Sequence, residues 1–273
     1  MIRDFKEEVV VITGAASGMG RAYALAFARE GARLALCDVD GEGLKETVAS
    51  LAGFTTQSPL VSVFDISEED AMFAFAEQVK QTLGPALVLI NNAGIEGSAK
   101  PVWTTSRADF ERVMGVNYFG VVHGTRAFLP QMMAENRGAI VNVSSIFGLV
   151  GTPNHADYCG SKFAVRGFTE ALMVELIESP IQVHLLHPGG IRTNIARQSH
   201  SQNFAQHFFK TTPEQVATVV IRAIRKNTPR IVYGHGATKT WLGERLLPLK
   251  WLKHLLWSEL KPVIDRSDYP KAR

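Results

Sequence analysis

A strand, a glycine-rich turn and a helix follow one another at the start of the chain, and this succession constrains the fold more than any other feature. The β-branched run 8–13 (EVVVIT) is typical of a buried strand and ends at Gly14. The turn 14–20 (GAASGMG) leads into the helix-forming run 21–30 (RAYALAFARE). Glycines let a backbone approach a diphosphate, and a helix N-terminus offers free N–H groups and partial positive charge. This order predicts a dinucleotide-binding βαβ unit. No Lys-Ser/Thr pair follows the glycines, which argues against a nucleoside-triphosphate loop.

The second expected strand, 33–37, ends at Asp38, eighteen residues after Gly20. A carboxylate at this position accepts hydrogen bonds from the ribose hydroxyls of an adenosine and repels a 2′-phosphate. Neither Ser17 nor Val39 supplies the positive charge that such a phosphate requires. We therefore expect NAD as the cofactor, and NADP is the less favoured alternative.

Strands and helices alternate along the rest of the chain. Further strands are expected at 60–65, 86–90, 139–143 and 181–187, of which 86–90 is uninterrupted in its apolar residues, and a last strand at 230–233. Such strands are typical of a parallel sheet covered on both faces. We predict an α/β fold, a Rossmann-type doubly wound parallel sheet of about seven strands with helices on both faces. Without a repeat or linker, residues 1–273 are expected to form a single domain, in which 236–273 are an amphipathic C-terminal extension.

Two helix starts are expected between these strands. Ser67 is predicted to cap a helix that continues to about Leu83, with Asp70 at its third position. Thr212 followed by Pro213 predicts the start of another helix.

Polar residues and glycines recur where the expected strands end. In an open parallel sheet, ligands bind at the carboxyl ends of the strands. We therefore expect one binding site at this edge of the sheet. The residues concerned are Gly14, Asp38, Asp65, Asn92, Ser145 and Gly189.

A serine, a tyrosine and a lysine can be brought together at the same edge. Ser145 follows the strand 139–143, and Tyr158 and Lys162 are four residues apart, so that they share one face of a helix. A hydroxyl, a phenol and an ammonium group at one point can transfer a proton. The alternative, a solvated helix face, is disfavoured because the dinucleotide motifs precede it.

Other polar residues have less specific signals. Asn117 lies between or within two helical stretches expected over 107–135, and the pattern alone favours a hydrogen-bonding role in the core over catalysis. Cys159 is expected to be a packed thiol. His155 and His187 are near the expected site, where contact with substrate is an alternative to packing.

The totals limit the class of protein. The 273 residues are 46% hydrophobic and 20% charged, which is typical of a globular protein in water. Two cysteines, Cys37 and Cys159, cannot form a disulfide framework, and the charged N-terminus has no apolar signal core. We therefore expect a cytoplasmic protein. No motif indicates nucleic-acid binding, and no metal ion is expected.

Taken together, the motifs resemble the short-chain dehydrogenases/reductases of the compact, non-extended type over nearly all of residues 5–235. The family pattern T-G-x-x-x-G-x-G matches 13–20, and N-N-A-G matches 91–94. Y-x-x-x-K matches 158–162 with Ser145 at the usual offset, and P-G-x-x-x-T matches 188–193. No catalytic position departs from the family pattern.

The resemblance implies a role for each matching residue. Tyr158 would be the general acid in carbonyl reduction and the base in alcohol oxidation. Lys162 would lower the pKa of that tyrosine and hold the ribose, and Ser145 would stabilise the substrate oxygen. Asn117 would hold a water in a proton relay behind Lys162. The implied cofactor-binding residues are Gly14, Ser17, Gly18, Met19, Gly20, Asp38, Asp65, Ile66, Asn92, Ala93, Gly94, Tyr158, Lys162, Pro188, Gly189, Ile191 and Thr193.

The implied activity is hydride transfer between NAD(H) and a secondary alcohol or ketone, in a homo-dimer or homo-tetramer. Two rival functions are an epimerase or dehydratase on the same fold and a non-catalytic sensor of dinucleotides. The glycine spacing argues against the first rival. The complete set of serine, tyrosine, lysine and asparagine argues against the second.

After Thr193 the resemblance says little about the substrate. Residues 194–210 are expected to cover it, and Phe204, Phe208 and Phe209 predict an apolar lid over a lipophilic small molecule.

The stretch 241–257 combines tryptophans, leucines and cations. Its leucines are expected on one helical stripe, Leu242, Leu246, Leu249, Leu252 and Leu256. This composition is typical of a helix on a membrane surface, while packing on a partner subunit or over the substrate pocket is the favoured alternative. Residues 191–273 carry 15 Lys and Arg against 5 Asp and Glu, whereas residues 1–190 carry 14 against 21. The C-terminal part is therefore basic.

Overall fold

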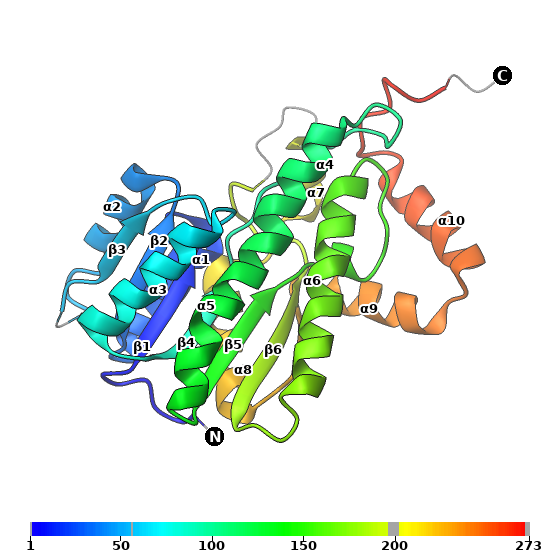
Figure 1. The fold of residues 1–273 in the computed structure, drawn as a ribbon. Coiled ribbons are helices and arrows are strands. Elements are labelled where there is room, and N and C mark those ends of the chain that lie inside the picture. The colour runs from blue at the N-terminus through cyan, green and yellow to red at the C-terminus, as the bar shows by residue number, and fades with distance from the viewer. Residues whose placement is uncertain (1, 56, 196–201, 271–273) are drawn as a thin grey trace.

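The computed structural model describes residues 2–55, 57–195 and 202–270, and its centre is a parallel sheet between two layers of helices (Figure 1). The seven strands lie in the order β3-β2-β1-β4-β5-β6-β7 and all pair in parallel. The predicted doubly wound α/β fold is thereby confirmed. The strands are β1 Val9–Thr13, β2 Arg33–Asp38, β3 Leu60–Val63, β4 Ala86–Asn91, β5 Gly138–Val143, β6 Ile181–Pro188 and β7 Arg230–Tyr233.

Helices cover both faces of the sheet. α1 and α8 pack together on one face, and α3, α5 and α6 lie on the other (Figure 1). The helices are α1 Gly18–Arg29, α2 Gly41–Ser50, α3 Glu69–Leu83, α4 Arg107–Met114, α5 Gly120–Ala134, α6 Ala156–Glu175, α7 Gln202–Phe208, α8 Pro213–Lys226, α9 Ala237–Leu246 and α10 Leu249–Leu260. A π-helical turn, η1 Gly115–Phe119, joins α4 to α5, and a 3-10 turn, η2 Ile146–Gly148, follows β5.

The continuous apolar strands are explained by a core on each face. Every residue of β1, β4, β5 and β6 is buried. On one face Phe27 of α1 meets Phe5 edge to face at 5.1 Å between ring centroids. On the other face Phe75 of α3 meets Phe128 of α5 at 6.2 Å. Aromatic pairs of this geometry stabilise a core beyond the area that they bury.

The chain changes direction in the sheet between β1 and β4. Ile12 of β1 pairs with Leu36 of β2 on one side and with Ile90 of β4 on the other, so the carboxyl ends of the three strands are level. Connections leave this point in opposite directions, which opens a crevice above the strand ends.

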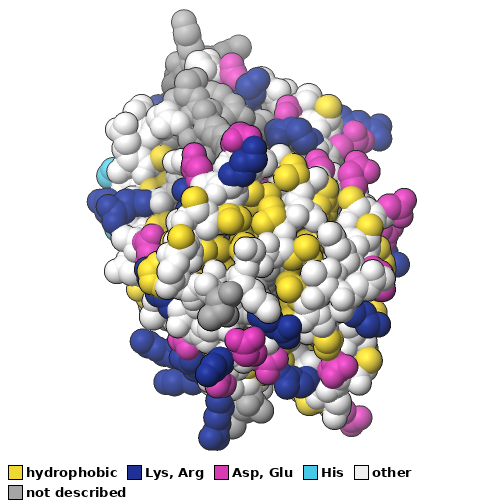
Figure 2. Space-filling view, turned by 90° about the vertical axis from the view of Figure 1, so that its left-hand side faces the viewer, with side chains coloured by type: hydrophobic (Ala, Val, Ile, Leu, Met, Phe, Trp, Pro, Cys, Tyr) yellow, Lys and Arg dark blue, Asp and Glu magenta, His cyan; other side chains and the backbone are white. Residues whose placement is uncertain are grey.

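The β3 edge of the sheet is partly open to water. Figure 2 views the side of the molecule that carries α2 and β3, where hydrophobic side chains gather in the middle and charged ones surround them. Val63 at the end of β3 is 59% exposed, and Val39, just after β2, is 64% exposed. This edge borders the crevice.

Of the two predicted helix starts, one is wrong and one is confirmed. α3 begins at Glu69 after Glu68, and Ser67 lies in the preceding turn, where its N–H donates to Asp65 Oδ1 at 2.9 Å. The start of α8 has the predicted Pro213 in its first turn. Thr212 caps this helix and forms a reciprocal capping box with Gln215.

The single leucine stripe predicted for 241–257 is also wrong. The segment forms two helices, α9 and α10, because Pro248 cannot continue α9. Leu246 and Leu249, on either side of the break, are 73% and 76% exposed, whereas Leu252 is 8% exposed. The predicted stripe is therefore divided between two surfaces. Among the described residues, no helix is both long enough and apolar enough to cross a membrane.

Candidate active site

A cleft and a pocket meet at the carboxyl edge of the sheet. The cleft lies over the ends of β1, β2 and β4, and the pocket lies over the ends of β5 and β6. Met19, Thr193 and Ile195 line both, so that the two spaces are continuous. The predicted cofactor residues along the cleft are Gly14, Ser17, Gly18, Met19, Asp38, Asp65, Ile66, Asn92, Ala93, Gly94 and Thr193, and those along the pocket are Met19, Tyr158, Pro188, Gly189, Ile191 and Thr193.

The glycine turn forms the floor of the cleft. Gly14 and Gly18 have φ values of +67° and +52°, which side-chain-bearing residues rarely adopt. Gly20 lines neither space; a Cβ on it would lie 1.9 Å from Gly14 O. These glycines therefore permit the close approach of backbone that a diphosphate needs.

Two charged side chains fix the shape of this turn. Asp38 Oδ2 accepts from Ala16 N at 2.9 Å, and Oδ1 accepts from Asp40 N at 3.1 Å. Arg21 donates to Ala16 O at 2.6 Å and pairs with Glu46 at 2.9 Å. The role of Arg21 was not anticipated from the sequence, where it reads only as a helix residue.

Asn92 provides a test of whether a dinucleotide fits the cleft. Its Nδ2 donates to Thr13 O at 2.9 Å and its N–H donates to Thr13 Oγ1 at 3.0 Å. Its Oδ1 is buried and has no partner among the described residues. An unpaired buried acceptor costs about 1–3 kcal/mol, and a ribose hydroxyl would satisfy it. The cleft therefore has the backbone approach and the acceptor that an adenine dinucleotide needs.

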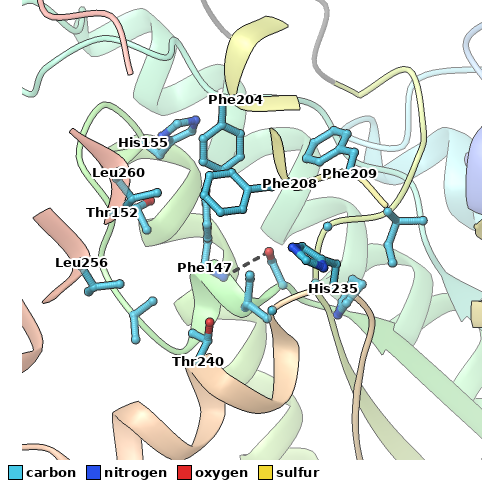
Figure 3. Close-up of a pocket in the computed structure, with 18 of the residues that line it drawn as sticks. Phe147, Thr152, His155, Phe204, Phe208, Phe209, His235, Thr240, Leu256 and Leu260 are labelled. Carbon is cyan, nitrogen blue, oxygen red and sulfur yellow. Dashed lines mark hydrogen bonds between the residues drawn. The ribbon is translucent and has the colours of Figure 1, made fainter. Parts of the chain in front are cut away.

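The structure brings Ser145, Tyr158 and Lys162 together. Ser145 stands at the start of η2, where its Oγ accepts from Phe147 N at 3.1 Å (dashed in Figure 3), and it is hydrogen-bonded to the Tyr158 side chain. Lys162 is 3% exposed, and its Nζ donates to Val143 O at 3.1 Å. The same Nζ lies 5.6 Å from the centroid of the Tyr158 ring.

Burial shifts the pKa values of both ionisable groups in this cluster. It raises the pKa of Tyr158 to about 12, although the hydrogen bond from Ser145 acts in the opposite direction. It lowers the pKa of Lys162 to about 8. The net lowering of the tyrosine pKa that we expected from Lys162 is therefore not seen. Desolvation is the largest cause of the raised pKa of Tyr158, and the Lys162 ammonium is engaged by Val143 O.

Asn117 lies in the π-helical turn and is fully buried. Its Oδ1 accepts from Ile95 N at 2.8 Å, and its Nδ2 donates to Ile95 O at 3.0 Å and to Ser161 Oγ at 3.1 Å. The side chain thus joins the loop after β4 to α6. A π-helical turn inside a helix frequently marks a functional site.

The loop after β4 has a second attachment that sequence reasoning missed. Asp157 is 1% exposed; its Oδ2 accepts from Ser98 N at 2.6 Å and its Oδ1 from Tyr158 N at 2.8 Å. This clamp fixes the loop that carries Glu96, which lines both the cleft and the pocket. The negative charge of Glu96 further raises the pKa of Tyr158. The sequence shows an acidic residue directly before Tyr158, but nothing in it identifies Ser98 as the partner.

The pocket beside Tyr158 is mainly apolar and aromatic. Figure 3 shows Phe204 and Phe208 of α7 facing Phe147, with Phe209 beside them. The centroid of Phe204 is 4.7 Å from that of Phe208 and 5.9 Å from that of Phe147. All three phenylalanines predicted for the lid therefore line the pocket. Positions 196–201 of the expected lid lie outside the described residues.

α9 and α10 close the pocket on the other side. Thr240 of α9 points into it, with Leu256 and Leu260 of α10 opposite (Figure 3). The segment after α10 fastens this wall, because Asn154 Nδ2 donates to Asp265 O at 2.7 Å and Tyr269 Oη donates to Asn154 Oδ1 at 2.9 Å. Helices α9 and α10 thus form part of the pocket, and the segment after α10 holds them in place.

The remaining candidates have different surroundings. His155 lines the pocket, and its Nδ1 lies 2.8 Å from Pro153 O. His187 is buried under Ser145 with Nδ1 2.8 Å from Ser145 O, and burial lowers its pKa to about 4. Cys159 is buried against Thr152, as predicted for a packed thiol.

Comparisons with known proteins identify the family of this chain. The short chain dehydrogenase family model matches residues 8–203. SadH of Mycobacterium tuberculosis (strain ATCC 25618 / H37Rv), itself assigned only provisionally as an oxidoreductase, is 41% identical over 244 residues, which are 84% of this chain and 87% of SadH. The chain therefore belongs to the short-chain dehydrogenase/reductase family. Members of this family are oxidoreductases that use NAD(H) or NADP(H) and act on small molecules.

Solved structures show both cofactors among similar proteins. A short chain dehydrogenase/reductase from Burkholderia phymatum in complex with NAD has a TM-score of 0.80 and 29% identity, covering 99% of this chain and 100% of its own. A metagenomic short-chain oxidoreductase in complex with NADP has a TM-score of 0.71 and 29% identity, covering 83% and 95%. The choice between the two cofactors therefore depends on this chain's own residues.

Proposed function

We propose that this protein is an NAD(H)-dependent dehydrogenase/reductase that interconverts a lipophilic secondary alcohol and its ketone. The observation that carries the proposal is the place of the Ser145–Tyr158–Lys162 cluster. It lies where a cleft suited to a dinucleotide meets a pocket lined by phenylalanines and leucines. A substrate in this pocket has its oxygen within reach of a proton donor, and most of its surface against apolar side chains.

The three side chains divide the chemistry at the substrate oxygen. During reduction the Tyr158 phenol gives its proton to the carbonyl oxygen, and during oxidation its phenolate takes the alcohol proton. A nicotinamide, when bound, supplies or accepts the hydride. The Ser145 hydroxyl donates a hydrogen bond to the oxygen where negative charge develops. The Lys162 ammonium holds the nicotinamide ribose and opposes the effect of burial on the tyrosine.

Asn117 acts mainly by positioning other residues through its side-chain hydrogen bonds. Its side-chain amide is occupied by Ile95 and Ser161, so it fixes the loop of Gly94 next to Lys162 Nζ. A water relay behind Lys162 would use the main chain of the π-helical turn or the second lone pair of Asn117 Oδ1, because both N–H groups of the amide are occupied. We propose this form of the relay.

The charges along the cleft favour NAD. Asp38, Asp40 and Asp65 line it, and its one lining arginine or lysine among the described residues, Arg112, lies 3.5 Å from Asp109. A 2′-phosphate on the adenosine ribose would meet the Asp38 carboxylate, whose orientation is fixed by Ala16 N. The negative charges of the 2′-phosphate and of the Asp38 carboxylate would repel each other, whereas the ribose hydroxyls of NAD can donate hydrogen bonds to this carboxylate.

Steady-state turnover with NAD and NADP over aliphatic, steroid and terpene alcohols tests the proposal. We expect kcat/KM to be at least about tenfold higher with NAD, since a hydrogen bond to a charged group contributes about 1.5–3 kcal/mol. Asp38→Ser should reduce the ratio of kcat/KM with NAD to kcat/KM with NADP. Tyr158→Phe should abolish turnover while NADH still binds. A preference for NADP would refute the assignment of Asp38. Tight NAD binding without turnover across the panel would favour a dinucleotide sensor instead.

An epimerase or dehydratase on this fold is the other enzyme alternative. It would give a product without net change in NADH absorbance, so the same assay separates it from a dehydrogenase. The glycine spacing of 14–20 supports the dehydrogenase.

The proposal also covers the oligomeric state, the domain organisation and the cellular location of the protein. We propose a homo-dimer or homo-tetramer formed through α5 and α6, because Phe119, directly before α5, and Phe163 of α6 are 47% and 40% exposed. Residues 1–273 would form one domain, with 236–273 as the extension that closes the pocket. The buried free thiols Cys37 and Cys159 support a reducing location such as the cytoplasm.

A further inference from the structure

A band of exposed apolar side chains occupies the corner between α9 and α10, which stand at the margin of the molecule outside the two helical layers (Figure 1). Leu246, Leu249 and Trp251 are 73%, 76% and 65% exposed. Large side chains are rarely left in water together without a partner. This α9–α10 band consists of Leu242, Leu246, Leu247, Leu249, Trp251 and Leu255.

The charges around the band are positive. The two acidic residues of α9 and α10 are both paired, Glu244 with Arg166 at 3.4 Å and Glu259 with Lys239 at 2.8 Å. Lys250 and Lys253 are exposed, and neither has an ion pair with another described residue. The corner therefore presents exposed leucines and a tryptophan next to uncompensated cations. This is the composition of helices that lie in the interface of an anionic bilayer.

The band is continuous with the substrate pocket. Leu252, Leu256 and Leu260 lie on the inner face of α10 and line the pocket. Leu255 belongs to both surfaces, because it lines the pocket and its side chain is 43% exposed. An apolar molecule leaving a lipid phase at this corner would pass from one apolar surface directly to the next.

The same observations argue against a second copy of the chain as the partner. A two-fold interface brings the same patch of both subunits together. Lys250 and Lys253 of both copies would then share one interface in which the carboxylates of α9 and α10 are already paired, and like charges within an interface are unfavourable. A surface of negative charge with an apolar interior matches both properties of the corner.

We propose that the α9–α10 band docks the protein on an anionic lipid bilayer, with α10 lying between the lipid headgroups and the substrate pocket. Docking itself requires only the band and its lysines. Its use for substrate entry rests on the proposed function.

Vesicle co-sedimentation of the full chain tests the docking. We expect the protein to sediment with phosphatidylcholine vesicles that contain phosphatidylglycerol, much less with phosphatidylcholine alone, and less as salt screens the lysines. Leu246→Ser and Leu249→Ser should each weaken partitioning about tenfold, because each removes an apolar side chain that the interface would bury. Lys250→Gln and Lys253→Gln should each weaken it about fivefold.

Val174→Ser and Ile177→Ser are matched controls, since these side chains are 72% and 79% exposed near the end of α6. They should sediment as the wild type does. The docking is refuted if the wild type stays in the supernatant with phosphatidylglycerol vesicles at low salt, or if Leu249→Ser sediments unchanged. It is also refuted if Leu249→Ser instead lowers the oligomeric state in light scattering, which would identify a subunit contact. Turnover of a short, water-soluble alcohol is measured separately, so failure of docking and failure of the proposed activity are distinguishable.

Discussion

Replacement of Asp157 should uncouple the loop after β4 from α6, the helix that carries Tyr158 and Lys162. Its carboxylate accepts from Ser98 N at 2.6 Å and Tyr158 N at 2.8 Å, in a place that is 1% exposed. A hydrogen bond to a charged group contributes about 1.5–3 kcal/mol. Asp157→Ala leaves two donors without their acceptor, so it should lower the free energy of unfolding by about 3–6 kcal/mol. Asp157→Asn keeps one acceptor oxygen, so its free energy of unfolding should fall by about half as much as that of Asp157→Ala.

Urea unfolding measures this loss, provided that the slope of the transition is unchanged. Asp109→Ala is the matched control, because Asp109 also lies in the first turn of a helix, α4, but its side chain is on the surface and bonded to Ser106 and Arg112. A surface substitution of this kind should cost at most about 1 kcal/mol. Equal losses for the two alanine variants would refute the clamp. The Asn variant should also lower kcat/KM, because the loop places Glu96 beside Tyr158.

Other parts of the site lead to further expectations. Because the pKa of Tyr158 is raised to about 12, alcohol oxidation through its phenolate should rise about tenfold per pH unit through neutral pH, while carbonyl reduction stays level. The pH profiles of kcat/KM in the two directions measure this, and level oxidation contradicts it. Gly20→Ala puts a Cβ 1.9 Å from a backbone oxygen and should abolish NADH binding in a fluorescence titration, whereas Gly160→Ala, with nothing within 4 Å, should leave it intact. Asn154→Ala frees the segment at Asp265 and should raise KM for an apolar substrate more than it lowers kcat; an unchanged KM would show that this contact does not hold the pocket wall.

The sheet and the Ser145–Tyr158–Lys162 cluster can be predicted from the sequence because both rest on short-range patterns. An uninterrupted apolar run is buried on both faces, and its end is marked by the next polar residue or glycine. Tyr158 and Lys162 share a helix face because of their spacing alone. Asp38 likewise follows directly from its place at the end of β2. The strand order then brings these ends to one edge without further information.

The clamp and the pocket wall could not be predicted in the same way. Asp157 and Ser98 are 59 residues apart, and nothing in either residue indicates the other. The pKa of Tyr158 depends on how completely neighbours exclude water, which a motif does not encode. The break between α9 and α10 is different, since Pro248 was a readable signal that the leucine stripe obscured.

The cofactor cleft and the pocket wall should respond differently to substitution, because one is built from backbone and the other from side chains. The cofactor cleft is built on the backbone between β1 and α1, where Gly14 and Gly20 meet each other directly and few replacements fit. The pocket wall is held by side chains, through Asn154 to Asp265 and through edge-to-face packing of Trp103 on Tyr269 at 5.1 Å. Side-chain contacts can be exchanged without disturbing the sheet. Substitutions in α7, α9 and α10 should therefore change which small-molecule substrate is accepted, while the binding of the dinucleotide stays the same.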